Sequence, residues 1–293
     1  MNGLNRQPLP SGHADHDDLA SLEQDLLWAT GGEALFEEKL RGFFRSAIDE
    51  VIDTARTGRF FFRELEKTEK TYLGTKFEIL LRDWLQVPRG VVLDLLIGGR
   101  EVDVKSTTAR FGWMIPPEAV NQLCILLAVN EADACCSVGL IRAKPNYLNR
   151  GANRDAKTTI AAAGRANIWW LARDFGYTPN FWSLIPEESR SEIMSLRGGT
   201  KRLALLFERH QQLPVSRVQI SAIAQQDDFM KRVRGNGGAR DLLKPKRIAI
   251  LYSENDREIM SRLGLRFGAR EFMSYAPANS EEARLLREAG RID

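Results

Sequence analysis

Cysteine, histidine and long apolar runs are all scarce in this sequence. Three cysteines and three histidines occur among 293 residues, and two of the cysteines, Cys135 and Cys136, are adjacent. Such thiols form neither a disulfide framework nor paired zinc ligands, so we expect them to be small core residues. His13 and His16 have the spacing of metal ligands but lack a thiol partner, which favours a polar role over a zinc site.

No apolar run approaches the roughly 20 residues that a membrane span requires. The first residues, MNGLNRQPLPSGHADHDD, also lack the basic start and the apolar stretch of a secretory signal. Their content of Pro, Gly and Asp is typical of disorder. We therefore predict a disordered lead-in over residues 1–20 and a cytoplasmic protein.

Positive charge is concentrated in the middle of the chain, although the formal net charge is only +3. Residues 141–250 hold 20 basic and 9 acidic side chains, whereas residues 1–140 hold 15 basic and 22 acidic ones. A basic surface binds phosphates with release of counterions, although such surfaces are also commonly just solvated. The pattern therefore favours a polyanionic partner.

The hydrophobic pattern predicts a mixed α/β domain after the lead-in. Apolar residues recur at helical spacing over 20–55 and 68–86, and the second of these helices carries Glu78. Short helices are expected after Pro116 and over residues 158–163. Runs of β-branched and apolar residues predict strands over residues 91–97, 100–106, 122–129 and 135–142.

A second domain is predicted beyond a linker at residues 174–181, DFGYTPNF, where Gly, Pro and Asn follow an apolar stretch. Helical patterns, a short basic helix, a Gly-rich turn and an apolar strand come next, in an order typical of a helix-turn-helix with a wing. We therefore divide the chain into an N-terminal domain over residues 21–175 and a winged-helix DNA-binding domain over residues 176–293.

The pair Gly98 and Gly99 is suited to a two-residue turn between the first two strands. With this turn, Asp94 lies opposite Asp103 across the hairpin. Directly opposed carboxylates are unfavourable unless a cation neutralises them. The hairpin therefore predicts a site for a divalent cation.

Alternation along the second strand gives it two different faces. Val102 and Val104 point to the core, whereas Asp103 and Lys105 share the other face with Glu101, a further candidate ligand. Hard oxygen ligands and a cation beside the developing charge are what magnesium-dependent phosphodiester hydrolysis needs. The alternative is an ordinary solvated hairpin face, because so short a pattern arises easily by chance.

Longer segments around this pattern carry a family resemblance. The order Glu78, Asp94, Asp103, Lys105 resembles the active-site spacing of the NaeI family of type II restriction endonucleases. The segments KTEKTYLGTKFE, GWMIPPEA, GANRDAKTT and AQQDDFMKRVRGNGGAR are similar to that family as well, in the same order along the chain.

The resemblance implies an N-terminal restriction-endonuclease-like domain of the PD-(D/E)xK type and a C-terminal winged-helix domain of the CAP-like type. It implies a homodimer that cleaves a palindromic double-stranded DNA sequence and binds a second copy of it as activator, as type IIE enzymes do. Asp94, Asp103 and Glu78 would bind Mg2+, and Lys105 would orient the attacking water. Leu93 stands where proline is usual before the first aspartate, a departure that removes no ligand.

Three further segments are candidate DNA contacts. GANRDAKTT contains residue types that bind base edges or phosphates, and GWMIPPEA, which carries Trp113, lies either against DNA or in a rigid buried corner. In the third segment, AQQDDFMKRVRGNGGAR, the basic side chains would line a recognition helix, and the Gly237-Gly238 turn would let backbone amides approach phosphate. The alternative is a solvated basic helix. The candidate DNA-binding residues are Asn153, Arg154, Lys157, Lys231, Arg232 and Arg234.

Three functions compete for this sequence. The first is a site-specific restriction endonuclease paired with a DNA methyltransferase, and the second is a repair or nicking endonuclease on the same fold. The third is a non-catalytic winged-helix regulator, against which the intact Asp94, Asp103 and Lys105 argue. A methyltransferase gene beside this one would favour restriction.

Overall fold

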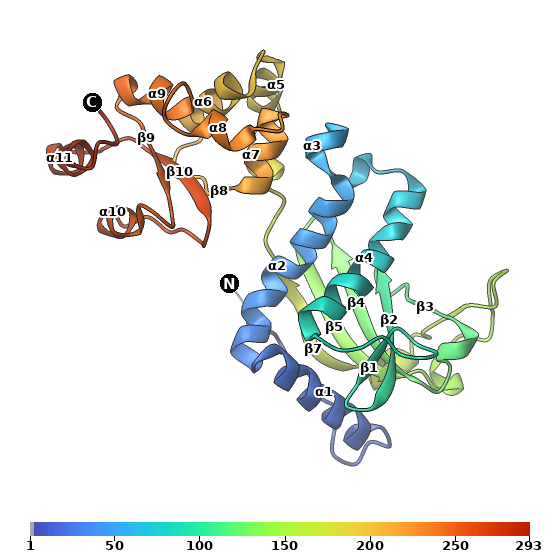
Figure 1. The fold of residues 1–293 in the computed structure, drawn as a ribbon. Helices are drawn as coiled ribbons and strands as arrows, with labels where there is room; N and C mark the ends of the chain where they lie inside the picture. Colours follow the sequence, from blue (N-terminus) through green and yellow to red (C-terminus); the bar gives the residue numbers. More distant parts are fainter. Residues whose placement is uncertain (1–2) are drawn as a thin grey trace. The chain divides into compact units, whose positions relative to one another are not determined.

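The computed structural model describes residues 3–293, which form two compact units (Figure 1). Unit 1 comprises the described residues up to Ile52 together with Phe61–Asn180, and unit 2 comprises Asp53–Phe60 and Phe181–Asp293. The short segment Asp53–Phe60 thus belongs with the second unit although it precedes most of the first. Nothing in the hydrophobic pattern of the sequence indicates this exchange.

Unit 1 begins with helices whose apolar faces cover one side of a sheet. In the second of them, Phe36, Leu40 and Phe44 recur at helical spacing and are buried. Gly31 ends the first at a φ of 85°, a left-handed conformation that glycine adopts without steric cost. The helices, which confirm the two predicted helical stretches, are α1 (His16–Thr30), α2 (Glu33–Ile52) and α4 (Lys67–Leu85).

The strands of unit 1 form a mixed sheet in the order β1-β2-β4-β5-β7. The β2 and β4 strands are parallel, and the other neighbours are antiparallel. This is the mixed α/β architecture that the sequence predicts. The strands are β1 (Leu95–Ile97), β2 (Arg100–Thr107), β4 (Leu123–Asn130), β5 (Cys135–Arg142) and β7 (Trp169–Gly176). Because β7 continues to Gly176, the expected linker at residues 174–181 is in part strand.

The two faces of this sheet pack against different layers. Val102 and Val104 of β2 are buried in the core beneath the helices, as predicted. On the opposite face, Cys124 belongs to a second apolar cluster with the buried Trp113. Asp103 pairs in register with Cys124 and is itself buried, so it lies on this second face. The cysteines are free thiols, and two of them, Cys124 and Cys136, are buried core residues.

Residues 3–15, which precede α1, are not the disordered lead-in that their composition predicts, and residues 1–2 lie outside the described part of the chain. Leu4 and Leu9 are buried in the core of unit 1. Gln7 forms a β-bridge with Trp170 of β7, with backbone hydrogen bonds in both directions. This segment therefore pairs with the edge strand β7 and buries two leucines in the core. Its polar composition gives no indication of this packing.

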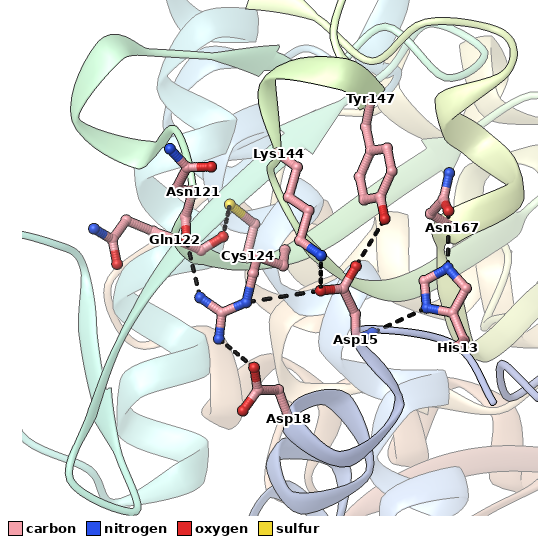
Figure 2. Close-up of polar contacts among 10 residues, drawn as sticks. His13, Asp15, Asp18, Asn121, Gln122, Cys124, Lys144, Tyr147 and Asn167 are labelled. Atoms are coloured by element: carbon pink, nitrogen blue, oxygen red, sulfur yellow. Dashed lines mark hydrogen bonds and ion pairs between the residues drawn. The ribbon is translucent and has the colours of Figure 1, made fainter. Parts of the chain in front are cut away.

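Asp15 anchors the end of this segment (Figure 2). Its buried carboxylate accepts a hydrogen bond from the Tyr147 hydroxyl at 2.9 Å and pairs with Lys144 Nζ at 2.7 Å. The nearby His13 bonds through Nε2 to Asn167 Oδ1 at 2.9 Å, and its Nδ1 accepts from the Asp15 amide. A buried carboxylate needs such compensation, and composition could not reveal it because Tyr147 is 132 positions away along the chain.

The stretch 158–163, expected to be a short helix, is extended over residues 158–160 and forms a turn at residues 162–163. Thr158 and Thr159 form β6 (Thr158–Thr159), which pairs with β3 (Met114–Ile115). Threonine is β-branched and favours an extended backbone. A 3-10 turn follows only at Gly164–Asn167, whereas the short helix predicted after Pro116 is present at Pro117–Ala119.

Unit 2 combines helices with a small antiparallel sheet in the order β8-β10-β9. Leu203 and Phe207 of α6 and Ile220 of α7 are buried, which confirms the two predicted helical patterns. The elements are α3 (Thr54–Thr57), α5 (Glu187–Ser195), α6 (Gly199–Arg209), β8 (Val215–Ser216), α7 (Arg217–Ala224), α8 (Phe229–Val233), α9 (Ala239–Leu243), β9 (Ala249–Tyr252), α10 (Arg257–Arg262), β10 (Glu271–Tyr275) and α11 (Ser280–Glu288). Across residues 3–293, no helix combines the length and the apolar character needed to cross a membrane.

Candidate active site

A tight turn brings the two predicted aspartates together. Gly98 and Gly99 have φ angles of 55° and 76°, the left-handed conformation that a two-residue hairpin turn of this kind requires. The strand register across the turn, continued by one residue beyond β1, sets Asp94 opposite Asp103. This is the pairing that the sequence predicts.

Lys105 lies beside both carboxylates. Its Nζ donates to Asp103 Oδ1 at 2.9 Å and to the Val104 carbonyl at 3.0 Å, and it lies 3.7 Å from Asp94 Oδ2. Burial lowers the pKa of Lys105, but Asp103, Asp94 and Glu78 outweigh this effect, so the pKa is raised. Lys105 is therefore a fixed positive charge at the hairpin.

Glu78, on α4, interacts electrostatically with Asp94, Lys105 and Asp103. Burial raises the pKa of Glu78 to about 7, with repulsion from Asp94 adding to the rise and attraction by Lys105 opposing it. Burial likewise raises the pKa of Asp103 to about 6, against the opposing effect of Lys105. The negative charge gathered here exceeds what one lysine neutralises, which is the electrostatic condition for cation binding.

The donor set fits a magnesium ion held by two carboxylates. Asp103 Oδ2 is buried and accepts no hydrogen bond within the described chain, although Lys105 Nζ lies 2.8 Å away as an ion-pair partner. Among residues 3–293, no three His, Cys, Asp or Glu side chains gather closely enough to form a metal cage. Magnesium usually takes one or two carboxylates and completes its octahedron with waters and substrate phosphate oxygens. Asp94 and Asp103 meet that requirement, with Glu78 beside them.

Glu101, the further candidate ligand, has other partners. Its carboxylate accepts hydrogen bonds from the backbone amides of Val91 and Leu93 at 2.6 and 2.7 Å. Alternation along β2 correctly placed it on the same side as Asp103, but could not show that the preceding loop folds over it. Glu101 is therefore engaged in holding that loop.

In the segment GANRDAKTT, residues 151–157 form a loop that is exposed up to Ala156 and leads into β6. Asn153 Oδ1 accepts from the amides of Asp155 and Lys157 at 3.0 and 2.9 Å, so this side chain shapes the loop with its oxygen. Arg154 is exposed and Lys157 is half-buried. The loop presents an arginine and a lysine to the surface, and their contact with DNA stays a prediction.

The Gly-rich turn in unit 2 differs from the expected phosphate-binding turn. The amide of Gly237 donates to Asp241 Oδ2 at 2.6 Å, so it is already occupied by a carboxylate. A Cβ at Gly238 would lie 2.0 Å from the Arg234 carbonyl oxygen, which shows that the glycine permits close packing between α8 and α9. The two glycines are explained by this turn itself.

The three basic residues expected to line a recognition helix lie in and just after α8, which has only five residues. Lys231 and Arg234 are exposed, whereas Arg232 forms an ion pair with Asp228. Their role in DNA binding stays a prediction.

Trp113 lies in a buried corner, the second of the two alternatives for GWMIPPEA. Its ring is fully buried, and Nε1 donates to the Leu127 carbonyl at 2.9 Å. Trp169 and Trp170 are also buried core residues. Cys124 lies next to Asp103 on the neighbouring strand, and burial, followed by repulsion from Asp103, raises the pKa of its thiol.

A mixed sheet with helices on one face, and with Asp94, Asp103 and Lys105 together on its edge hairpin, is consistent with a restriction-endonuclease-like fold. The family model described as "Restriction endonuclease NaeI" matches residues 37–283. The type II restriction enzyme NaeI of Lentzea aerocolonigenes is 36% identical over 265 residues, which cover 88% of this chain and 82% of that enzyme. The chain belongs to the NaeI restriction endonuclease family.

Proposed function

We propose that this protein is a type II restriction endonuclease that hydrolyses double-stranded DNA at a specific palindromic sequence with Mg2+. The observation that carries the proposal is the convergence of Asp94, Asp103 and Lys105 at one hairpin, where Lys105 Nζ lies 2.8 Å from the buried Asp103 Oδ2 and 3.7 Å from Asp94 Oδ2. The kinship with a type II restriction enzyme supports site-specific cleavage over repair.

Each residue of the site has a separate task in this proposal. Asp94 and Asp103 hold the ion, which when bound polarises the phosphate and lowers the pKa of a coordinated water. Lys105 orients the attacking water and stabilises negative charge developing on the phosphate. Glu78 would complete the site from α4 as a further carboxylate for the ion, since its charge interacts with Asp94, Lys105 and Asp103.

Unit 2 is proposed to be a winged-helix domain that binds a second copy of the recognition sequence and activates cleavage. Support comes from the element order α6, β8, α7, α8, α9, β9, α10, β10 and from the sheet order β8-β10-β9. The long connection between β9 and β10, which includes α10, lies where a wing would be. The basic excess of residues 141–250 supports a polyanionic partner for part of this unit.

The proposed assembly is a homodimer, because a palindromic duplex presents two equivalent half-sites to a two-fold symmetric protein. The proposed partner in the cell is a DNA methyltransferase of the same specificity, which would protect the host's own sites. Asn153, Arg154 and Lys157 are proposed to contact DNA from unit 1.

The experiment is incubation of the purified protein with phage and plasmid DNA in magnesium buffer, with Asp103→Asn as control. Discrete double-strand fragments from the wild type only are the expected result. Nicked circles without linear product would favour the repair or nicking enzyme. Binding without any cleavage would favour the non-catalytic regulator.

A further inference from the structure

Glu101 precedes Asp103 by two positions on β2, yet it bonds to a different part of the site. Its carboxylate accepts hydrogen bonds from three consecutive backbone amides, those of Val91 at 2.6 Å, Val92 at 3.3 Å and Leu93 at 2.7 Å. Three amides converging on one side chain form a concave anion site in the backbone. Here the anion is supplied by the protein itself.

These amides belong to the segment that leads into Asp94. Residues 91–94 form neither helix nor strand, and the side chains of Val91 and Val92 are 95% and 71% exposed. Within residues 91–94, Leu93 is the one hydrophobic side chain that is buried. An exposed segment of irregular structure is mobile unless its backbone groups are bonded. Glu101 therefore fixes the backbone that leads into Asp94, while the Val104 amide donates to the Asp94 carboxylate itself at 2.8 Å.

Gly90 leaves the room that this arrangement needs. A Cβ at Gly90 would lie 2.4 Å from Glu101 Oε2 and 2.6 Å from the Leu93 carbonyl oxygen. The backbone at Gly90 is not in the left-handed region, so glycine is needed here for steric reasons. Any side chain would displace either the Glu101 carboxylate or the segment that it holds.

The bond between Glu101 and the loop is charge-assisted. A glutamate side chain is ionised at neutral pH, and three backbone amides donate to the carboxylate of Glu101. Hydrogen bonds to an ionised acceptor are roughly twice as strong as neutral ones. An amide in place of the carboxylate would lose this charge and could not accept through both of its terminal atoms.

We propose that Glu101 is a positioning residue: by holding residues 91–93 it keeps Asp94 opposite Asp103 and so preorganises the magnesium site. The inference rests on the proposed function, because the placement matters only if both aspartates hold the ion. Without a cation the two carboxylates repel each other. A loosened segment lets Asp94 move away, and metal binding must then order the segment first, which lowers the metal affinity.

The test compares Glu101→Gln and Gly90→Ala with the wild type, using Glu38→Gln as a matched control because Glu38 is an exposed carboxylate on α2 of the same unit. Binding of Mn2+ to the protein is measured by electron paramagnetic resonance, and cleavage of phage DNA is measured against magnesium concentration. Thermal unfolding and DNA binding without divalent ions are recorded in parallel.

Both test variants are expected to weaken Mn2+ binding and to raise the magnesium concentration for half-maximal cleavage by roughly 10- to 100-fold, the usual cost of losing a partner that orients a metal ligand. Saturating magnesium should restore most of the rate, and DNA binding should be unchanged. Glu38→Gln should behave as the wild type.

Asp94→Asn separates the two ideas that are under test. If Asp94→Asn is inactive while Glu101→Gln binds Mn2+ and responds to magnesium as the wild type does, the positioning role is overturned and the proposed function stands. If Asp94→Asn still cleaves DNA, the proposed site itself fails. A Glu101→Gln protein that unfolds at lower temperature, with cleavage that no magnesium concentration restores and with unchanged Mn2+ binding, also overturns the positioning role.

Discussion

The carboxylate of Asp94 accepts a hydrogen bond from the backbone amide of Val104 at 2.8 Å. Val104 lies between Asp103 and Lys105 in the chain, and its side chain is buried in the core beneath the helices. The backbone of β2 therefore sets the spacing of all three polar groups. Any change that shifts this strand in the core is expected to disturb the catalytic geometry as well.

Replacing either aspartate should abolish cleavage and spare DNA binding. Asp94→Asn or Asp103→Asn removes a charge that the ion needs, and the ion acts mainly on the transition state. The metal ion stabilises the transition state by several kcal/mol, so losing it should lower the cleavage rate by about a thousandfold or more. Lys105→Ala should lower the rate in the same way. Initial cleavage rates and gel-shift affinities check this; wild-type cleavage by any of the three variants would contradict the assigned site.

Calcium should support DNA binding without turnover. It binds oxygen ligands at 2.3–2.6 Å in flexible geometry, whereas magnesium demands an octahedron at about 2.0–2.1 Å. The attacking water is therefore poorly placed beside Lys105 when calcium replaces magnesium. Parallel binding and cleavage assays in each ion give the answer, and rapid cleavage in calcium alone would refute the mechanism.

A duplex carrying the recognition sequence should accelerate cleavage of a plasmid that has one site. Occupancy of unit 2 by the second copy is expected to favour cleavage by a coupling free energy of about 1–3 kcal/mol. Alanine at Lys231, Arg232 and Arg234 should remove the stimulation and leave basal activity. The measurement is the initial rate with cognate and unrelated duplexes, with Arg284→Ala on α11 as a basic control. Equal rates with bound cognate duplex would refute the two-site proposal.

Glu78 should make the metal-free protein less stable as pH rises. Its pKa is raised from 4.5 to about 7 by burial first and by Asp94 second, so between these values the folded state holds a proton that the unfolded state has lost. Stability then falls with pH across this window. Melting temperatures in EDTA from pH 4.5 to 7 should fall more for the wild type than for Glu78→Gln, and parallel curves for the two proteins would rule out the raised pKa.

Asp15→Ala should destabilise unit 1 by about 1–3 kcal/mol, because the buried Tyr147 hydroxyl loses its acceptor. Asp18 is the matched control: its carboxylate pairs with Arg142 but is half exposed, so Asp18→Ala should cost less than about 1 kcal/mol. Urea unfolding of the two variants compares them directly. Equal losses would show that the Asp15 contacts add nothing beyond a surface ion pair.

Local pattern sufficed for the hairpin that carries the chemistry. The register across Gly98-Gly99, the alternation of Val102, Asp103 and Val104, and the helix carrying Glu78 all follow from periodicity and turn chemistry, which act between neighbours in the sequence. The sequence by itself therefore determined where Asp94, Asp103 and Lys105 lie relative to one another.

Tertiary structure decided the features that depend on partners distant in the chain. Residues 3–15 look disordered by composition, but Leu4 and Leu9 are buried in the core of unit 1, and Asp15 binds Lys144 and Tyr147, both more than 100 positions away. Glu101 resembles a third metal ligand by alternation, yet the loop before Asp94 folds onto it. Asp53–Phe60 belongs to unit 2 because of contacts with residues distant in the sequence. Periodicity shows which face of a helix or strand is apolar, whereas only the tertiary structure shows what that face packs against.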